Sequence, residues 1–156
     1  MIDLANACLR CGLRKARHTN QRSLIKVKTP KASPQQPSTI AIVDDDPAVC
    51  NSLKFSLETE GFKVRTYAGA GELLRHGNLG TFDCFVIDQR MPVMSGLELI
   101  ATLRGRKIAT PVILIISQPS ASLSARAAQA KVPIVEKPFL GNALVDRIRE
   151  ACAPGG

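Results

Sequence analysis

The sequence of 156 residues lacks any long apolar run. Its longest uninterrupted one, Val112–Ile116, has the length of a strand, whereas a helix that crosses a bilayer needs roughly 20 apolar residues. The first residues also lack the apolar segment and the cleavage site of a secretory signal. With 45% apolar and 22% charged residues, the composition is that of a globular domain. We therefore expect a soluble, cytoplasmic protein with no segment inserted in a membrane.

Cysteine is scarce as well, with five residues at scattered positions. An odd number at irregular spacing does not fit a disulfide framework, so we interpret these residues as reduced thiols. Cys8 and Cys11 form a C-x-x-C pair to which His18 could add a third ligand. No second Cys/His pair follows at the spacing of a zinc site, so the pair does not predict a metal centre.

Acidic residues are nearly absent from the first 38 positions, which hold eight Lys/Arg and only Asp3. The remaining residues hold thirteen Lys/Arg and twelve Asp/Glu. The high isoelectric point of the whole sequence therefore comes from a basic arm and not from a basic domain. A short amphipathic helix over 3–17 and a Pro-rich linker over Thr29–Thr39 fit this arm. We expect residues 1–38 to be a disordered basic extension. Contact with an anionic membrane or with nucleic acid is the alternative, but the arm has no aromatic residues for stacking.

From residue 40 onward, apolar runs of strand length alternate with segments of helical spacing. Asp46 and Pro47 are typical of a helix start, and Gly61 of a helix end. The predicted strands are Ile40–Val43, Phe62–Tyr67, Phe82–Ile87, Pro111–Ile116 and Val132–Val135, and the predicted helices are 47–60, Gly71–His76, Leu97–Leu103, Leu123–Ala130 and Leu140–Cys152.

This alternation with short loops predicts an α/β protein with an open parallel sheet and helices on both faces. Ligands of such sheets bind beyond the carboxyl ends of the strands. Polar side chains follow four of the predicted strands at this edge: Asp44 and Asp45, Asp88, Ser117 and Lys137.

Three carboxylates that meet in one pocket repel each other unless a cation lies between them. An all-oxygen site of this kind suits Mg²⁺, which is commonly held by one or two carboxylates and a phosphate oxygen. An ammonium group and a hydroxyl at the same edge add positive charge and a neutral donor. The set predicts phosphoryl transfer, with one carboxylate as the nucleophile.

Four stretches carry a resemblance to a known family: I-V-D-D-D-P (42–47), V-I-D-Q-R-M-P-V-M-S-G-L-E-L (86–99), P-V-I-L-I (111–115) and V-E-K-P-F (135–139). Residues 39–153 resemble the receiver domain of bacterial two-component response regulators, in the style of nodulation and nitrogen-fixation regulators. The resemblance implies a flavodoxin-like (βα)5 three-layer sandwich with a parallel sheet in the order 2-1-3-4-5.

The same resemblance implies a role for each matching residue. Asp88 would accept a phosphoryl group from a phosphohistidine of a sensor histidine kinase. Asp45 would bind Mg²⁺ directly, Asp44 mostly through water, and Arg90 through its backbone carbonyl, with Asp88 completing the metal site. Lys137 would pair with a phosphoryl oxygen, and its bond to the following proline would be cis. The loop over the pocket would be shaped by Met91, Pro92 and Gly96.

Two positions depart from the family pattern. The family has Thr or Ser at the end of the fourth strand, where an ungapped count places Ile116. Ser117 could take this catalytic position if the strand ends one residue later. The family also has Tyr or Phe three residues before the lysine, where this chain has Ile134. In the family the hydroxyl and the aromatic side chain act together as a switch. With isoleucine at both positions, we expect this coupling to be rewired or lost.

The leading hypothesis is a stand-alone phosphoacceptor without an output domain, which signals to a downstream protein effector through its last two helices and fifth strand. It would not be an enzyme beyond catalysing its own phosphorylation and dephosphorylation. The alternative is a degenerate receiver that binds partners without phosphorylation, which Ile116 and Ile134 favour. A metal-dependent phosphatase with an aspartyl nucleophile is disfavoured, because such enzymes place a second Asp where this chain has Arg90.

Overall fold

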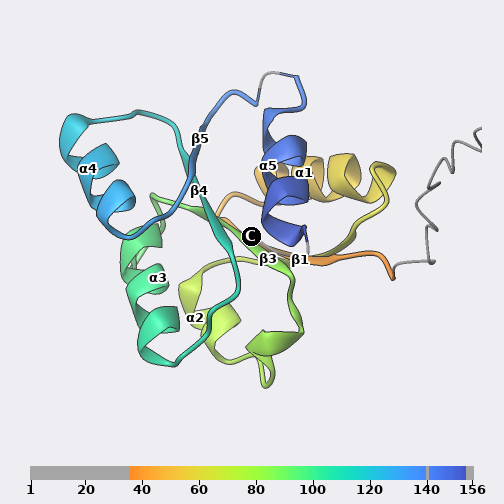
Figure 1. The fold of residues 1–156 in the computed structure, drawn as a ribbon, viewed down its shortest axis with the longest axis horizontal. Coiled ribbons are helices and arrows are strands. Elements are labelled where there is room, and N and C mark those ends of the chain that lie inside the picture. The colour runs from red at the N-terminus through yellow and green to blue at the C-terminus, as the bar shows by residue number, and fades with distance from the viewer. Residues whose placement is uncertain (1–35, 140, 154–156) are drawn as a thin grey trace, which may run out of the picture. The chain divides into compact units, whose positions relative to one another are not determined.

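Five parallel strands alternate with five α-helices along the chain (Figure 1). This computed structural model describes residues 36–139 and 141–153. The expected amphipathic helix, the Cys8–Cys11 pair, His18 and most of the expected linker lie outside the described residues. Within the described ranges, no helix is long and apolar enough to cross a membrane.

The elements follow the predicted order, with one short 3₁₀ helix (Leu79–Thr81) that the sequence analysis did not predict. The strands are β1 (Thr39–Val43), β2 (Lys63–Tyr67), β3 (Cys84–Asp88), β4 (Val112–Ile116) and β5 (Ile134–Glu136). The α-helices are α1 (Pro47–Thr59), α2 (Ala70–Leu74), α3 (Gly96–Gly105), α4 (Ala121–Gln129) and α5 (Ala143–Cys152).

The sheet confirms the predicted fold class, because all five strands are parallel and their order is β2-β1-β3-β4-β5. The middle strand is β3, whose neighbours are β1 and β4. Val43, the last residue of β1, is paired with Ile87, and Asp88 is paired with Ile115 of β4. The carboxyl ends of the three central strands therefore lie side by side, as a site built from several strand ends requires.

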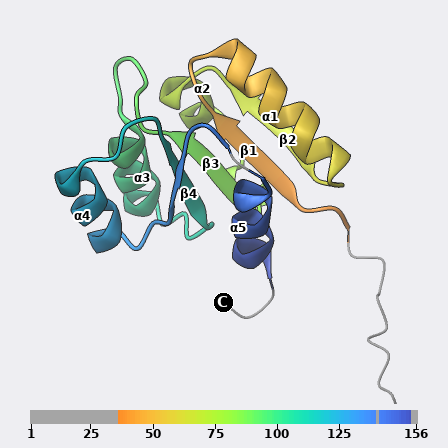
Figure 2. The same ribbon diagram turned by 90° about the horizontal axis from the view of Figure 1, so that it is seen from above.

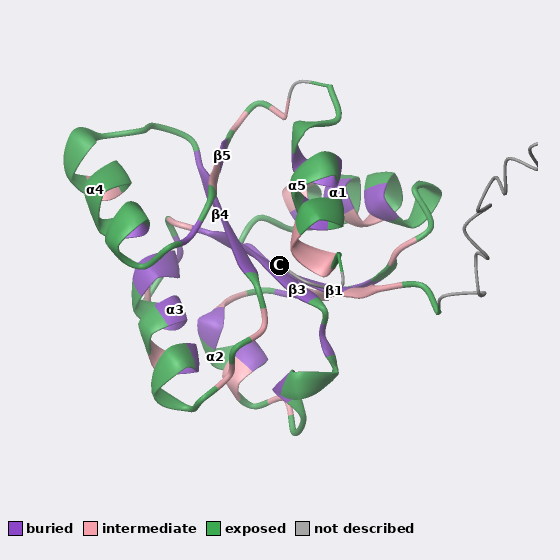
Figure 3. Ribbon diagram, viewed as in Figure 1, coloured by how far each residue is buried: buried purple, intermediate pink, exposed green. Residues whose placement is uncertain are grey.

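Each face of the sheet has its own apolar core, because successive side chains of a strand point to opposite faces. Helices α2, α3 and α4 cover one face, and α1 and α5 cover the other (Figures 1 and 2). The strands are buried between these layers, whereas the outer sides of the helices are exposed (Figure 3). The largest fully buried side chains include Leu73, Leu99 and Leu103 in the first core and Leu57, Ile113 and Ile115 in the second.

The ends of α1 match the prediction. The Asp46 carboxylate accepts a hydrogen bond from the Ala48 backbone N–H at 2.8 Å, and Pro47 is the first helical residue. The helix ends before Gly61, whose positive φ of 91° is a conformation that glycine adopts without strain.

The predicted start of α5 was wrong. The helix begins at Ala143 and not at position 140, because Gly141 has a φ of 61°, outside the helical range. The last strand is also shifted, from the predicted Val132–Val135 to Ile134–Glu136. Just before this strand, the Pro133 carbonyl accepts a hydrogen bond from the Leu114 N–H of β4, whereas Pro133 has no N–H to donate.

Candidate functional site

Three of the predicted site residues meet at the carboxyl edge of the sheet. Asp44 follows β1, Asp88 ends β3, and Lys137 follows β5. The Lys137 Nζ donates hydrogen bonds to Asp88 Oδ1 at 2.7 Å and to Asp44 Oδ2 at 2.8 Å. The Lys137–Pro138 peptide bond is cis, as the family resemblance implied. One ammonium group thus bridges carboxylates from two neighbouring strands.

Both carboxylates are deeply buried, with 3% of Asp44 and 5% of Asp88 exposed. Burial raises the pKa of Asp88 above its ordinary value, although the hydrogen bonds and the charge of Lys137 act in the opposite direction. Burial alone would lower the pKa of Lys137, but its hydrogen bonds to Asp44 and Asp88 outweigh this effect and raise that pKa. The lysine is therefore held in its charged form beside the two acids.

The other oxygens of these carboxylates accept hydrogen bonds from the backbone. Asp44 Oδ1 accepts from the Asp46 N–H at 2.9 Å, and Asp88 Oδ2 accepts from the Arg90 N–H at 2.6 Å. Each oxygen thus has one fixed donor and keeps a second lone pair for a ligand. Both side chains are oriented by the loops that follow their own strands.

The side chain of Asp45 is exposed to solvent, unlike those of Asp44 and Asp88. Among the described residues, no three His, Cys, Asp or Glu side chains are grouped closely enough to hold a metal ion. The donor chemistry nevertheless suits Mg²⁺. Asp44, Asp45 and Asp88 offer only oxygen ligands, their charge exceeds that of Lys137 by two, and Mg²⁺ usually needs only one or two carboxylates beside its water ligands.

The end of β4 differs from what a role for Ser117 would need. The strand ends on Ile116 and does not extend to Ser117. The catalytic role of Ser117 stays a prediction. Ile116 is buried in the core beneath α3 and α4, whereas Ser117 is exposed beyond the strand. None of the hydrogen bonds among the described residues involves the Ser117 hydroxyl. The last residue of β4 is therefore aliphatic, and the nearest hydroxyl, that of Ser117, lies outside the strand.

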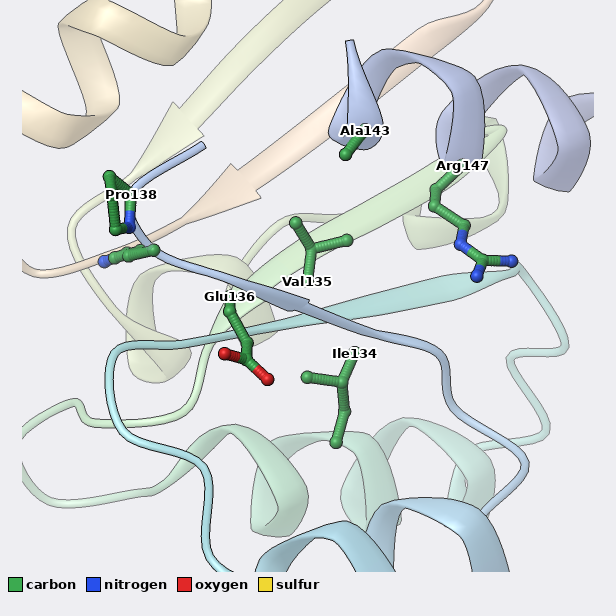
Figure 4. A pocket seen from close by; sticks show the side chains of 7 residues that line it. Ile134, Val135, Glu136, Pro138, Ala143 and Arg147 are labelled. Atoms are coloured by element: carbon green, nitrogen blue, oxygen red, sulfur yellow. The ribbon is translucent and has the colours of Figure 1, made fainter. Parts of the chain in front are cut away.

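Ile134 of β5 lies two residues before the register partner of Ile116, because Ile134 is opposite Leu114 and Glu136 is opposite Ile116. It packs against the same apolar core as Ile116. Figure 4 shows Ile134 and Val135 pointing to opposite sides of β5, with Val135 on the side of α5. The two departures from the family pattern thus belong to one continuous apolar surface on the α4 side of the sheet.

Gly96 joins the start of α3 to the end of β3. A Cβ atom at this position would lie 2.6 Å from the Asp88 carbonyl oxygen and 2.7 Å from Leu114 Cδ1, so only glycine fits. The Gly96 N–H donates to the carbonyl of Gln89 at 3.0 Å. In the same loop Met91 is buried and Pro92 is exposed. The loop after Asp88 is thereby fixed to the first turn of α3.

Two residues near the site were missed by the sequence analysis. Gln89 Oε1 accepts a hydrogen bond from the Leu97 N–H at 3.2 Å at the start of α3. The Cys50 Sγ of α1 donates to the Asp44 carbonyl oxygen at 3.3 Å, and burial raises the pKa of this thiol. The position of Gln89 directly after Asp88 could have indicated its role, whereas no pattern in the sequence connects Cys50 with Asp44.

Comparisons with known proteins identify the family to which this fold belongs. Residues 40–149 match the response regulator receiver domain family. The C4-dicarboxylate transport transcriptional regulatory protein DctR of Rhodobacter capsulatus is 34% identical over 118 residues, which are 74% of this chain and 60% of that protein. The transcriptional regulatory protein FixJ of Rhizobium meliloti is 35% identical over 114 residues, which are 72% of this chain and 56% of that protein. The chain thus spans little more than half the length of these relatives.

A solved structure gives the same result. The CheY-like response regulator receiver domain protein from Methanospirillum hungatei JF-1 superimposes with a TM-score of 0.68 and 29% identity, over 74% of this chain and 94% of that chain. The strand order β2-β1-β3-β4-β5 of this chain is the order of the CheY-like fold. The chain belongs to the response regulator receiver domains, the signalling modules of two-component systems.

Proposed function

We propose that the chain accepts a phosphoryl group on Asp88 from a sensor histidine kinase and passes the signal on by contact with a downstream protein. The observation that supports this most directly is the pair of hydrogen bonds from Lys137 to Asp88 and Asp44, which places an ammonium group beside a buried carboxylate. A structural ion pair at the protein surface would not need two buried acids around one lysine.

In this reaction an Asp88 oxygen forms a bond to phosphorus while the bond between phosphorus and the donor nitrogen breaks, and the donor leaves as a histidine. Lys137 keeps Asp88 available as a carboxylate nucleophile and neutralises charge on the transferred group. The Arg90 N–H holds the second Asp88 oxygen and so orients the carboxylate.

Mg²⁺ is the metal that the donor set suits. Asp45 and Asp88 would bind it through carboxylate oxygens, Asp44 mostly through water, and Arg90 through its backbone carbonyl. When bound, the metal supplies positive charge to the phosphoryl oxygens.

Acetyl phosphate tests the acceptor role. Incubation with acetyl phosphate and Mg²⁺ is expected to add the mass of one phosphoryl group to the intact chain, and Asp88→Asn is expected to abolish this gain. Asp146→Asn, an exposed position on α5, is the matched control and should be modified like the wild type. Absence of any mass gain in the wild type at millimolar Mg²⁺ contradicts the proposal.

A pair of neighbouring substitutions tests the metal site. Asp45→Ala is expected to weaken Mg²⁺ binding by at least about tenfold in a calorimetric titration, because it removes a charged ligand. Asp46→Ala should leave the Mg²⁺ affinity nearly unchanged and lower the free energy of unfolding by about 1 kcal/mol, because it removes only the cap of α1. Equal Mg²⁺ affinities of the wild type and the Asp45 variant would refute the assignment of this ligand.

A degenerate receiver that binds partners without phosphorylation is the second candidate. The burial of Ile116 and the contact of Ile134 with the same core favour it, since neither side chain can respond to a phosphoryl group through a hydrogen bond. Partner affinity that is the same for the wild type treated with acetyl phosphate and for Asp88→Asn would favour this candidate over the first.

A further inference from the structure

A polar cavity lies at the amino edge of the sheet, where β1 and β2 begin. It has a volume of about 440 Å³, and its lining includes Lys63 and Arg65 of β2 together with His76, Asn78 and Thr81 from the segment between α2 and β3. No Asp or Glu is among the described residues that line this Lys63–Arg65 cavity. The carboxyl edge, where the two buried aspartates lie, is five residues further along β1, or roughly 16 Å away at about 3.3 Å per residue.

Two positive charges of β2 belong to this cavity. Lys63 and Arg65 are two residues apart, so their side chains lie on the same face of the strand, which is the face that Tyr67 buries in the core beneath α2. Neither Lys63 nor Arg65 forms an ion pair with another residue of the described ranges 36–139 and 141–153. Asp83, directly before β3, does not line the cavity, and its carboxylate accepts a hydrogen bond from the Thr39 N–H at 2.7 Å. The cavity therefore carries positive charge that its own lining does not neutralise.

His76 holds Arg65 in place at the wall of the cavity. The centre of its ring lies 5.9 Å from that of Tyr67 and 5.3 Å from that of Phe82, so aromatic packing orients the imidazole. Arg65 Nη1 lies 3.1 Å from His76 Nε2, and the Asn78 N–H donates to His76 Nδ1 at 3.4 Å. The guanidinium is thus positioned by a ring whose own orientation is fixed.

These contacts leave one donor of His76 without an acceptor. A neutral imidazole has one nitrogen that donates and one that accepts. When Nδ1 accepts from the Asn78 N–H, Nε2 carries the proton and faces the Arg65 guanidinium, which can only donate. In the other tautomer, the two donors that meet are Nδ1 and the Asn78 N–H. An anionic oxygen beside Arg65 and His76 removes the conflict, because it accepts from both the guanidinium and the Nε2–H.

We propose that the Lys63–Arg65 cavity binds the phosphate group of a small organic phosphate. Lys63 and Arg65 match the two charges of a phosphate monoester, and a planar guanidinium donates paired hydrogen bonds to phosphate oxygens. The His76 Nε2–H adds a neutral donor, with Asn78 and Thr81 in the same lining. The volume of about 440 Å³ lies in the range of small-molecule pockets, so the rest of the ligand occupies the same cavity. The site lies at the opposite edge of the sheet from Asp88 and does not depend on the proposed function.

Inorganic phosphate tests anion binding by the full chain. It is titrated while the backbone amide resonances of residues 76–81 are followed by NMR, and these resonances should shift. Arg65→Gln should weaken phosphate binding about tenfold, because it removes a charge-assisted contact. His76→Phe should weaken it about threefold, because it keeps the aromatic packing and removes the neutral donor. Arg75→Gln is the control, since it removes an equal charge one residue before His76 and Arg75 lines a different cavity. At physiological salt it should change the affinity by less than about twofold.

Three results of this titration would overturn the proposal. The first is the absence of shifts at residues 76–81, and the second is a phosphate affinity that neither Arg65→Gln nor His76→Phe changes. The third is equal weakening by Arg75→Gln and Arg65→Gln, which would show a general attraction of anions and no defined site.

Further probes test the class of ligand. Acetate at equal ionic strength should bind about tenfold more weakly than phosphate, because it carries a single charge, and equal affinities would contradict the assignment to phosphate. Glycerol 3-phosphate should bind at least as tightly as inorganic phosphate, whereas weaker binding would mean that the cavity does not admit an organic group. A short phosphoserine peptide represents the other source of a phosphate monoester. If it binds more tightly than glycerol 3-phosphate, the cavity recognises a phosphorylated protein and the assignment to a small molecule is wrong.

Discussion

Asp88 combines two properties that conflict in most proteins, because it is buried at the end of the central strand and is expected to react as a carboxylate. Burial raises its pKa, and Lys137 opposes this effect from 2.7 Å away. Lys137 also serves Asp44, so its single charge is shared between two acids. The folded chain therefore holds more negative charge in this pocket than the lysine can neutralise, which is the condition that favours a cation.

The raised pKa of Asp88 predicts a dependence of stability on pH in metal-free buffer. The folded state binds the proton of Asp88 more tightly than the unfolded state, so this group lowers stability as pH rises from the ordinary carboxyl pKa of about 4 through its raised folded value. Asp88→Asn has no such group. The free energy of unfolding of the variant relative to that of the wild type should therefore increase between pH 4 and pH 7, as measured by urea denaturation in EDTA. If the free energies of unfolding of the two proteins change with pH in parallel, this account is contradicted.

The sequence predicted the position of those site residues that stand at the ends of strands. Asp44 and Asp88 come directly after apolar runs, and Lys137 follows one after Glu136. Parallel strands bring such ends to one edge. The exposure of Asp45 was not predictable, because adjacent residues after a strand can face the pocket or the solvent.

At the scale of elements, α3 is attached through Gly96 to β3, the strand that ends on Asp88. Gly96→Ala is expected to lower the free energy of unfolding by about 2 kcal/mol or more, because its Cβ would overlap the Asp88 carbonyl oxygen and Leu114. Gly105→Ala, at the other end of the same helix, is the control, since a Cβ there meets no atom within 4 Å. It should leave stability unchanged or raise it by up to about 1 kcal/mol. Chemical denaturation of both variants measures the difference, and equal effects would contradict the close approach at Gly96.

Strands were easier to predict than helix ends. The four apolar residues of Ile40–Val43 and the five of Val112–Ile116 identify buried parallel strands because both faces of the sheet are covered. The start of α5 was placed too early because Leu140 continues the helical spacing, whereas the backbone at Gly141 does not continue the helix. Such a φ value is permitted but not required by glycine, so the sequence alone could not give it.

At the scale of the whole molecule, two apolar cores pack on opposite faces of one sheet, so loss of either core exposes a face of that sheet. All residues of both described cores lie between Ile40 and Cys152. A chain that lacks residues 1–35 is therefore expected to unfold in a single transition, with a free energy of unfolding within about 0.5 kcal/mol of that of the full chain. Its phosphorylation by acetyl phosphate should also be unchanged.

Removal of four further residues provides the contrast. The Lys63 N–H of β2 donates to the Ser38 carbonyl at 2.9 Å, and the Thr39 N–H donates to Asp83 Oδ2 at 2.7 Å. A chain without residues 1–39 loses both bonds and the first residue of β1, so its stability should fall by roughly 1–3 kcal/mol relative to the chain without residues 1–35. Urea unfolding followed by circular dichroism compares the three chains. If the shorter deletion already abolishes cooperative unfolding, residues before position 36 contribute to the core and the assignment of the stable unit to the receiver domain is wrong.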